Sequence, residues 1–242
     1  MKTQQIEYTF DGARMVGHLA YNDQVSGPRA GILVLPEWWG LNAHARERAE
    51  RLAKMGYAAL AVDLYGDGRV ADTPDQAAAL YGEVMGDIPG VAKGRILAAR
   101  AALLSVADPD RIGVIGFCFG GTLALHMARL GTPFRAFVSF HGNYDTEAPA
   151  EAGRALGPVL VCDGADDQLR DEASIPVLKT EFERAQVPLT FRSYIGAQHA
   201  FTNPAADEKA KKYGLPLAYN EAADTASWTD MTTFLAEALG PR

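Results

Sequence analysis

The chain has 242 residues, of which 48% are hydrophobic and 22% are charged, and its formal net charge is −7. This length suits one α/β domain over residues 1–242, with enough hydrophobic side chains for a large core. The negative charge argues against nucleic acid or an anionic membrane as a partner, and no apolar run approaches the roughly 18 residues that a membrane span needs.

Two strands of alternating polarity open the chain, at 6–10 and 15–21, and Asp11-Gly12 between them predicts a hairpin turn. Short apolar runs then alternate with helical patterns. The runs predict strands that are apolar on both faces, at 31–35, 57–62, 112–116, 136–140, 158–163 and 189–195. The helical patterns cover 43–55, 74–85, 91–105, 122–130, 172–186 and 221–239, and the stretch 202–219 is expected to be a surface loop. This alternation predicts a mostly parallel sheet of eight strands, flanked by helices.

A glycine-rich turn, Gly116-Phe-Cys-Phe-Gly-Gly121, follows the predicted strand at 112–116 and precedes a predicted helix. This arrangement is typical of a nucleophile elbow, which presents its central side chain at the C-terminal edge of the sheet. The central residue is Cys118, at a helix N-terminus whose dipole favours negative charge. The turn therefore indicates attack of a thiolate on an acyl carbon, although a buried structural cysteine fits the same pattern.

The hairpin, the sheet and the elbow together predict an α/β-hydrolase fold with a minimal lid, in which nucleophile, acid and histidine follow in that order along the chain. The second cysteine, Cys162, lies inside the apolar run 158–162, so we expect no disulfide framework. The first residues lack the apolar segment of a secretion signal. We therefore expect a reduced, cytoplasmic protein.

The chain has five histidines, and one of them occupies the position of the base. His199 follows the last predicted strand, where this fold places its catalytic histidine. His18, His44 and His126 lie in the opening hairpin or within helices, away from the elbow. His141 ends the strand at 136–140 on the catalytic edge and remains open, although it precedes the acid, which is the wrong order for this fold.

The acid is expected after the strand at 158–163, where three aspartates occur. Asp163 still belongs to the strand, and Asp166 suits a turn or a solvated surface charge. The spacing from Gly164 places Asp167 in the loop beyond the strand end, facing the histidine loop. Asp167 is therefore the preferred acid, which orients the imidazole and stabilises the imidazolium, with Asp166 as the alternative.

Four motifs in this order resemble those of dienelactone hydrolases (carboxymethylenebutenolidases), over nearly the whole chain. They are Pro36-Glu-Trp-Trp-Gly-Leu-Asn42, the elbow, Gly164-x-x-Asp167 and Gln198-His-Ala-Phe-Thr-Asn203, and Asp63-Leu-Tyr-Gly66 and Ser139-Phe-His-Gly142 also match. The resemblance implies a Cys118-His199-Asp167 triad that hydrolyses a small-molecule lactone or ester through a thioester. It also implies that no metal or cofactor takes part.

The resemblance gives Glu37 a role that its position alone would not. In this family a glutamate at that place interacts with the resting thiol and assists its deprotonation when substrate arrives. A carboxylate beside a thiol also disfavours a premature thiolate and so protects it from oxidation. The backbone N–H groups of Trp38 and Phe119 are then the expected oxyanion donors. Without the resemblance, Glu37 would be interpreted as a surface acid at a strand end.

The sequence departs from the well-known dienelactone hydrolases in its arginines. Those enzymes hold the substrate carboxylate with two arginines, one shortly after the catalytic histidine, whereas the residues after His199 include none; Arg69 and Arg95 are the nearest candidates. The substrate is therefore not expected to be dienelactone itself. Aromatic side chains instead suggest an apolar pocket, although each also suits core packing: Trp38, Trp39, Tyr81 and Phe201.

Two other protein classes share parts of this pattern. Glutamine amidotransferases also carry a cysteine elbow, but their histidine is followed two residues later by an acid, and here that position is Phe201. A catalytically impaired hydrolase fold that binds a ligand or senses oxidants is physically possible, since a thiolate oxidises readily. It predicts the loss of a triad member, whereas all three are present. The protein is expected to be a monomer or a small homo-oligomer.

Overall fold

The computed structural model describes residues 1–24, 27 and 29–240. The chain divides into two compact units, one made of Met1–Ile115 with the C-terminal residues from Leu239, the other of Gly116–Ala238. Strand β5 (Ala107–Phe117) runs through the boundary between them. Each unit is described by itself below.

The strands of the first unit follow the order β1-β2-β4-β3-β5. β1 (Lys2–Phe10) and β2 (Ala13–Tyr21) form an antiparallel hairpin, β2 pairs antiparallel with β4 (Ala58–Ala61), and β4 pairs parallel with β3 (Arg29–Leu35). The predicted turn at Asp11-Gly12 is confirmed, with φ of 49° and 75°, the left-handed values that a tight two-residue hairpin requires.

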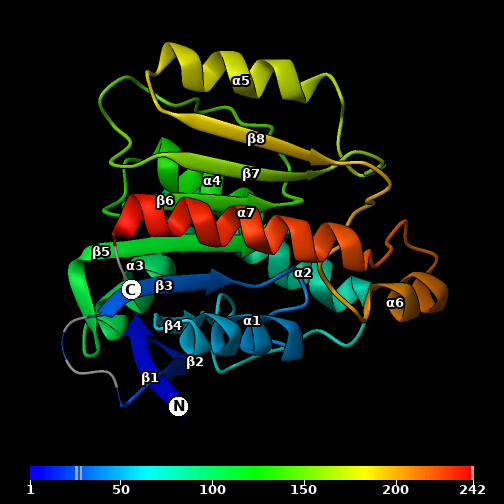
Figure 1. Cartoon of the computed structure of the whole chain (residues 1–242). Helices are drawn as coiled ribbons and strands as arrows, with labels where there is room; N and C mark the ends of the chain where they lie inside the picture. Colours follow the sequence, from blue (N-terminus) through cyan, green and yellow to red (C-terminus); the bar gives the residue numbers. More distant parts are fainter. Residues whose placement is uncertain (25–26, 28, 241–242) are drawn as a thin grey trace. The chain divides into compact units, whose positions relative to one another are not determined.

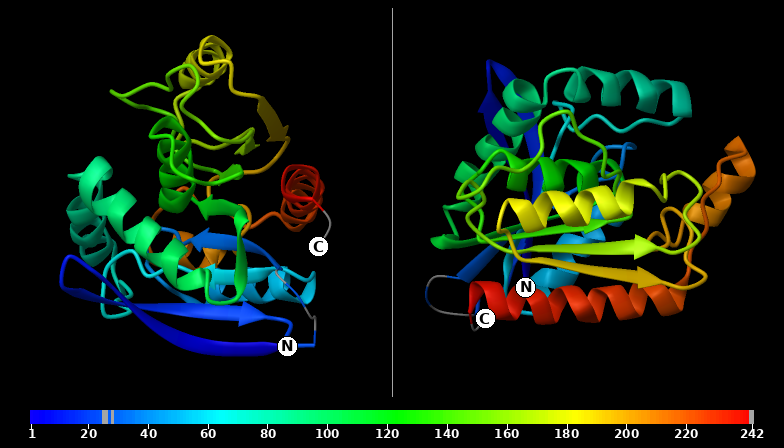
Figure 2. Two further views of the ribbon diagram at one scale, coloured as in Figure 1. Left: turned by 90° about the vertical axis from the view of Figure 1, so that its left-hand side faces the viewer. Right: turned by 90° about the horizontal axis from the view of Figure 1, so that it is seen from above.

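Helices cover both faces of the strands of the first unit. α1 (Ala43–Lys54) starts at Asn42, whose side chain accepts the Ala45 N–H, and α2 (Pro74–Met85) starts at Thr73 in the same way, with proline at its first position. A π-helical turn (Ile88–Ala92) leads into α3 (Lys93–Leu103). α1 and α3 lie on opposite faces (Figure 2).

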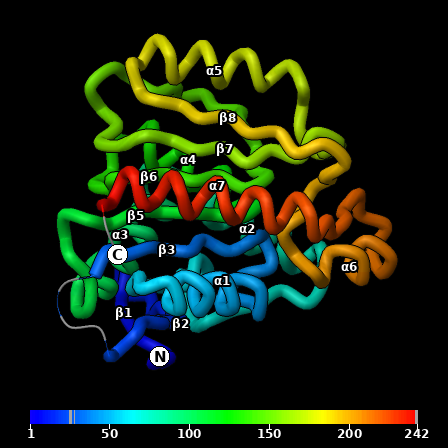
Figure 3. The backbone as a smooth tube through the Cα atoms, viewed as in Figure 1, coloured from blue at the N-terminus to red at the C-terminus, as the bar shows by residue number. Residues whose placement is uncertain are grey.

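The second unit holds the parallel strands β6 (Ala136–Phe140), β7 (Val159–Gly164) and β8 (Leu189–Tyr194). α4 (Phe119–Arg129) and α5 (Ser174–Arg184) cover one face of these strands, and α7 (Glu221–Leu239) covers the other (Figures 1 and 2). Because β7 and β8 are parallel, the loops that follow them leave at the same end (Figure 3). This end carries the candidate site.

Two local predictions were wrong. The stretch 202–219 is not all loop, since α6 (Ala206–Tyr213) forms within it, with acidic side chains in its first turn, basic ones in its last, and Gly214 in the left-handed conformation at its end. β8 is not buried on both faces: Thr190, Arg192 and Ser193 are exposed, as befits the last strand in the order.

The predicted fold class is confirmed, because the described residues form eight mostly parallel strands flanked by helices. Within the part of the chain that is described, no helix is long and apolar enough to cross a membrane.

Candidate active site

Cys118 lies in a strained turn between β5 and α4. Its φ of 52° and ψ of −115° belong to a region that residues other than glycine rarely adopt. Flanking glycines make the turn possible: a Cβ on Gly116 would lie 2.0 Å from the Gly120 carbonyl oxygen, and one on Gly121 would lie 2.7 Å from that of Phe140. The predicted elbow is therefore present, with a half-buried thiol at its centre.

The backbone N–H of Cys118 is held by two acceptors on the neighbouring strand end. It donates to the Phe140 carbonyl oxygen at 2.9 Å and to Nδ1 of His141 at 3.0 Å. Strained backbone persists only where surrounding groups determine it, and this three-centred bond is such a constraint.

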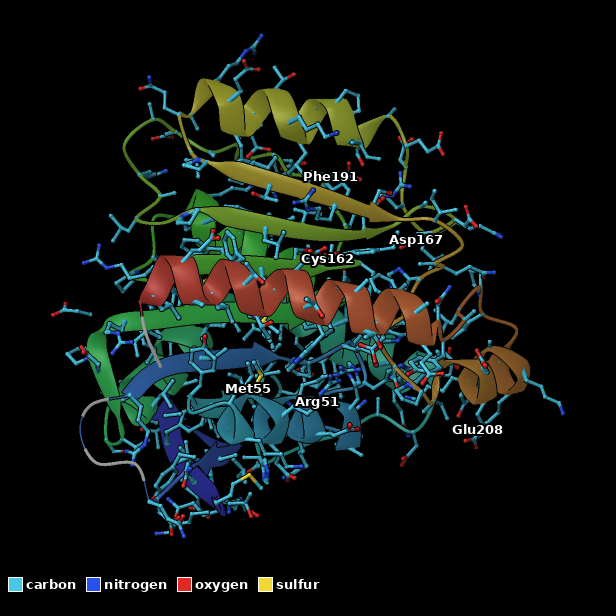
Figure 4. The ribbon with its side chains drawn as sticks, viewed as in Figure 1. Arg51, Met55, Cys162, Asp167, Phe191 and Glu208 are labelled. Carbon is cyan, nitrogen blue, oxygen red and sulfur yellow. The ribbon has the colours of Figure 1, made fainter. Side chains whose placement is uncertain are left out.

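His199 and Asp167 form a buried hydrogen-bonded pair. Nδ1 of His199 donates to Oδ2 of Asp167 at 2.8 Å, and the other carboxylate oxygen accepts the Leu169 N–H at 2.8 Å. Asp167 lies in the loop beyond the end of β7 (Figure 4), whereas Asp166 is exposed. With Nδ1 engaged by the acid, Nε2 is the nitrogen left for the hydrogen bond between the imidazole and the Cys118 thiol.

The surroundings of His199 favour its charged form. Burial alone would lower the pKa of the imidazole, but the charge of Cys118, followed by the hydrogen bond and charge of Asp167, overcomes this and raises the pKa to about 10. An imidazole in this setting can take a proton from the thiol and keep it while negative charge stays on sulfur. The three residues thus have the chemistry of a nucleophile, a base and an orienting acid.

Cys162, the other cysteine, has none of these properties. It lies on β7 with no exposed surface (Figure 4), and burial raises the pKa of its thiol to about 12. Its sulfur is 3.6 Å from the Tyr194 hydroxyl, which donates in turn to Asp230. A thiol that stays protonated at neutral pH is a poor nucleophile.

Asp163, the first of the three aspartates considered for the acid, belongs to a buried cluster at the end of β7. Its Oδ1 lies 2.7 Å from Nε of Arg170 and accepts the Tyr144 hydroxyl at 2.8 Å, while Oδ2 accepts the Ser193 hydroxyl at 2.8 Å. Arg170 is itself buried, three residues after Asp167. The ion pair therefore ties the loop that carries Asp167 to the end of β7.

The remaining histidines separate into two kinds. His18 and His44 lie in the first unit, hydrogen-bonded to Glu50 and Arg48, and burial lowers the pKa of His126 to about 4. His141 differs, because its ring centre lies 5.1 Å from that of His199. The sequence places His141 on the catalytic edge and leaves its role open, and the hydrogen bonds of its ring carry no signal in the sequence.

The motif that contains Glu37, Trp38 and Trp39 lies in the first unit. Glu37 follows β3 and is 2% exposed. The Trp38 carbonyl accepts the Tyr65 hydroxyl at 2.8 Å, and the rings of Trp38 and Trp39 meet edge to face at 5.1 Å. Trp38 is half-buried and Trp39 is buried.

The three remaining predicted residues differ in exposure. Tyr81, on α2, is 36% exposed. Phe119 is the first residue of α4 and is buried. Phe201 has no exposed surface and packs against His141 and Tyr194.

The two candidate arginines are both bonded to the loop after β4. Arg69 donates to the carbonyl oxygens of Tyr65 and Gly66 and pairs with Glu83 at 3.2 Å. Arg95 donates to the Leu64 carbonyl oxygen at 2.6 Å, and burial lowers the pKa of its guanidinium. In this structure both side chains hold the chain's own backbone.

Comparison with known proteins finds relatives over nearly the whole chain. A model described as the dienelactone hydrolase family matches residues 15–239. A solved dienelactone hydrolase-like promiscuous phosphotriesterase from metagenomic libraries is 38% identical, with a TM-score of 0.90 and 99% of each chain covered. The solved protein m3DLH is 40% identical, with a TM-score of 0.87 over 99% of each chain. A provisionally named carboxymethylenebutenolidase from Aquifex aeolicus is 27% identical over 85% of this chain and 89% of that one.

Proposed function

The chain belongs to the dienelactone hydrolase family, and on that premise we propose that it hydrolyses a small carboxylic ester or lactone through a thioester on Cys118. His199 is the general base in this proposal and Asp167 orients it. The observation that carries the proposal is the 2.8 Å bond from His199 to Asp167, on an imidazole that also bonds the elbow thiol.

The reaction has two halves. Nε2 of His199 takes the Cys118 proton, the sulfur bonds to the carbonyl carbon, and the carbonyl electrons move to oxygen. The backbone N–H groups of Phe119 and Trp38 are the proposed donors to that oxyanion. When the intermediate collapses, the C–O bond breaks and the alcohol leaves with the proton from His199. A water activated by His199 then cleaves the thioester, which releases the acid and restores the thiol.

Glu37 is proposed to assist deprotonation of the resting thiol, as the family implies. Glu37→Gln removes a carboxylate while it keeps the size of a buried side chain that is 2% exposed. General-base contributions are typically 10²–10⁴-fold, so we expect a loss of roughly that size in kcat/KM. The alkylation rate of Cys118 by iodoacetamide should also change across pH. Unchanged kinetics together with unchanged alkylation would reduce Glu37 to a structural residue.

The substrate class is an uncharged ester or lactone. Support comes from the residues after His199, which include no arginine, and from Arg69 and Arg95, each of which already donates to a backbone carbonyl. Trp39, Tyr81 and Phe201 remain the proposed pocket residues. A panel of chromogenic esters and lactones tests this class directly.

The two cysteines provide a matched test of the nucleophile. Cys118→Ala should fold normally and lose on the order of 10⁴-fold or more in kcat, whereas Cys162→Ala should keep turnover because its thiol is buried and protonated. Mass spectrometry should find the acyl group on Cys118 after rapid quenching. Activity of Cys118→Ala within about tenfold of wild type would falsify the assignment. If the wild-type protein hydrolyses none of the esters or lactones, the alternative of an impaired, oxidant-sensing hydrolase fold is favoured.

A second candidate activity is phosphotriester hydrolysis, which the relative at 38% identity favours. The same thiolate would attack phosphorus and expel an aryl alcohol, which takes its proton from His199, and water would then cleave the S–P bond. Repeated release of a chromogenic phenol from an aryl dialkyl phosphate supports this activity. Release of a single equivalent followed by permanent inactivation would exclude it as a catalytic function.

Cytoplasmic location and a monomeric or small homo-oligomeric state remain predictions. Both cysteines are free thiols, which suits a reducing compartment.

A further inference from the structure

His141 lies beneath the elbow and connects two loops of the site. Its Nδ1 accepts the Cys118 N–H at 3.0 Å, and its Nε2 lies 2.9 Å from the Thr202 hydroxyl oxygen. Thr202 is fully buried and comes three residues after His199. We propose that His141 is a positioning residue, which holds the nucleophile backbone and the loop of the base in register through one fixed tautomer.

The hydrogen bonds determine that tautomer. A backbone N–H can only donate, so Nδ1 of His141 must carry a lone pair and no proton. The proton of a neutral ring is then on Nε2, where it donates to the Thr202 hydroxyl oxygen. The ring is therefore neutral, with Nε2 as its donor. A proton on Nδ1 would face the Cys118 N–H and remove the acceptor.

The neutral tautomer suits the position because of what surrounds the ring. His199 is a titratable ring beside it, the backbone N–H of Cys118 bonds its Nδ1, and the rings of Phe117 and Phe201 lie next to it. The proposed mechanism forms an imidazolium on His199, and a second positive ring at a centre-to-centre distance of 5.1 Å would oppose that charge. A neutral His141 can hold the elbow without this repulsion.

The backbone conformation of the two loops explains why a positioning residue is useful here. Cys118, His141 and Ala200 all have positive φ, at 52°, 39° and 60°. Each is a non-glycine residue in a conformation that persists only when neighbouring groups enforce it. His141 bonds the first of these residues directly, and through Thr202 it bonds the loop that contains the third.

Thr202 provides the matched variants. Thr202→Val keeps the shape and removes the hydroxyl, and Thr202→Ser keeps the hydroxyl. We expect Thr202→Val to lower kcat about three- to tenfold with little change in KM, because one hydrogen bond that orients the ring is lost. Thr202→Ser should have a kcat close to that of the wild type. Equal kinetics in both variants, or a loss confined to KM, would overturn the proposal.

A second pair tests the ring itself. His141→Asn supplies an acceptor near the place of Nδ1 and tolerates positive φ, whereas His141→Leu supplies no acceptor. We expect Leu to lower kcat by roughly 10- to 100-fold and Asn to recover a large part of that loss. Thermal unfolding of each variant identifies a failure to fold. If a His141 variant does not fold, the comparison of Thr202→Val with Thr202→Ser tests the proposal.

The inference rests on the proposed function, but nitrogen NMR of the resting protein tests the tautomer without measuring turnover. The role of His141 can therefore be refuted while the proposed hydrolase function stands. An unprotonated Nδ1 and a protonated Nε2 on His141 are expected in the wild type, with a mixture of tautomers in Thr202→Val. Iodoacetamide alkylation of Cys118 should change in the same variants. A protonated Nδ1 in the wild type would refute the proposal even if the protein hydrolyses esters.

Discussion

Asp166 and Asp167 are adjacent carboxylates, and only one of them bonds the imidazole. Asp167→Asn should lower kcat by about 10³–10⁴-fold, because an amide can hold the wrong tautomer of His199. Asp166→Asn changes an exposed side chain and should stay within about twofold of wild type. Steady-state kinetics on one chromogenic ester compare the two, and a reversed ranking would move the acid by one residue.

The pKa of His199 carries a second prediction. The charge of Cys118 is the largest factor that raises it, so in Cys118→Ala an NMR titration should find a lower pKa than the wild-type value of about 10. The raised pKa also sets how stability depends on pH. A group whose pKa is higher in the folded than in the unfolded state stabilises the fold most when it is protonated. This contribution is fully present below pH 6.5 and is lost as pH rises towards 10. An unchanged titration in the variant contradicts the pairing.

At the scale of elements, two glycines differ in what surrounds them. Gly116→Ala would place a Cβ 2.0 Å from the backbone oxygen of Gly120, so the end of β5 or the start of α4 must shift. We expect a loss of several kcal/mol or failure to fold. Gly82→Ala lies in exposed helix α2 with nothing within 4 Å of the new atom. It should stabilise the protein by roughly 0.5–1 kcal/mol, as urea unfolding can measure.

Most elements could be predicted because their local signals agree with their packing. The Asp11-Gly12 turn and the Thr73-Pro74 start of α2 are examples in which a short pattern has one structural solution. α6 was missed although Gly214 and the charge order along Ala206–Tyr213 indicated a helix, because the lysines and prolines around it favoured a loop. β8 was wrongly predicted to be apolar on both faces like the other short runs, because its place at the end of the strand order is not visible in the sequence.

Only part of the candidate site could be predicted from the sequence. Chain order and four motifs placed Cys118, Asp167 and His199 and identified the family correctly. The role proposed for His141 could not be derived from the sequence, because it rests on a φ of 39° and on contacts with residues 23 and 61 positions away. No periodicity in the sequence records such contacts.

At the scale of the whole molecule, charge should influence which substrates react. The net charge of −7 repels anions, and Arg69 and Arg95 are bonded to carbonyl oxygens. We expect a neutral ester to have a kcat/KM at least about tenfold above that of the same ester carrying a carboxylate. The gap should narrow with added salt, since screening weakens the repulsion. An equal rate for both esters would indicate a cation in the pocket.

The positive φ of Cys118 also limits which residues natural selection can accept at this position. A branched Cβ is strongly disfavoured at a φ of 52°, so threonine is closed to this position whatever its chemistry. Serine has the same unbranched Cβ as cysteine and fits the turn. The lineage can therefore exchange sulfur for oxygen at this site by a single substitution, and the choice between them is made by reactivity rather than by shape.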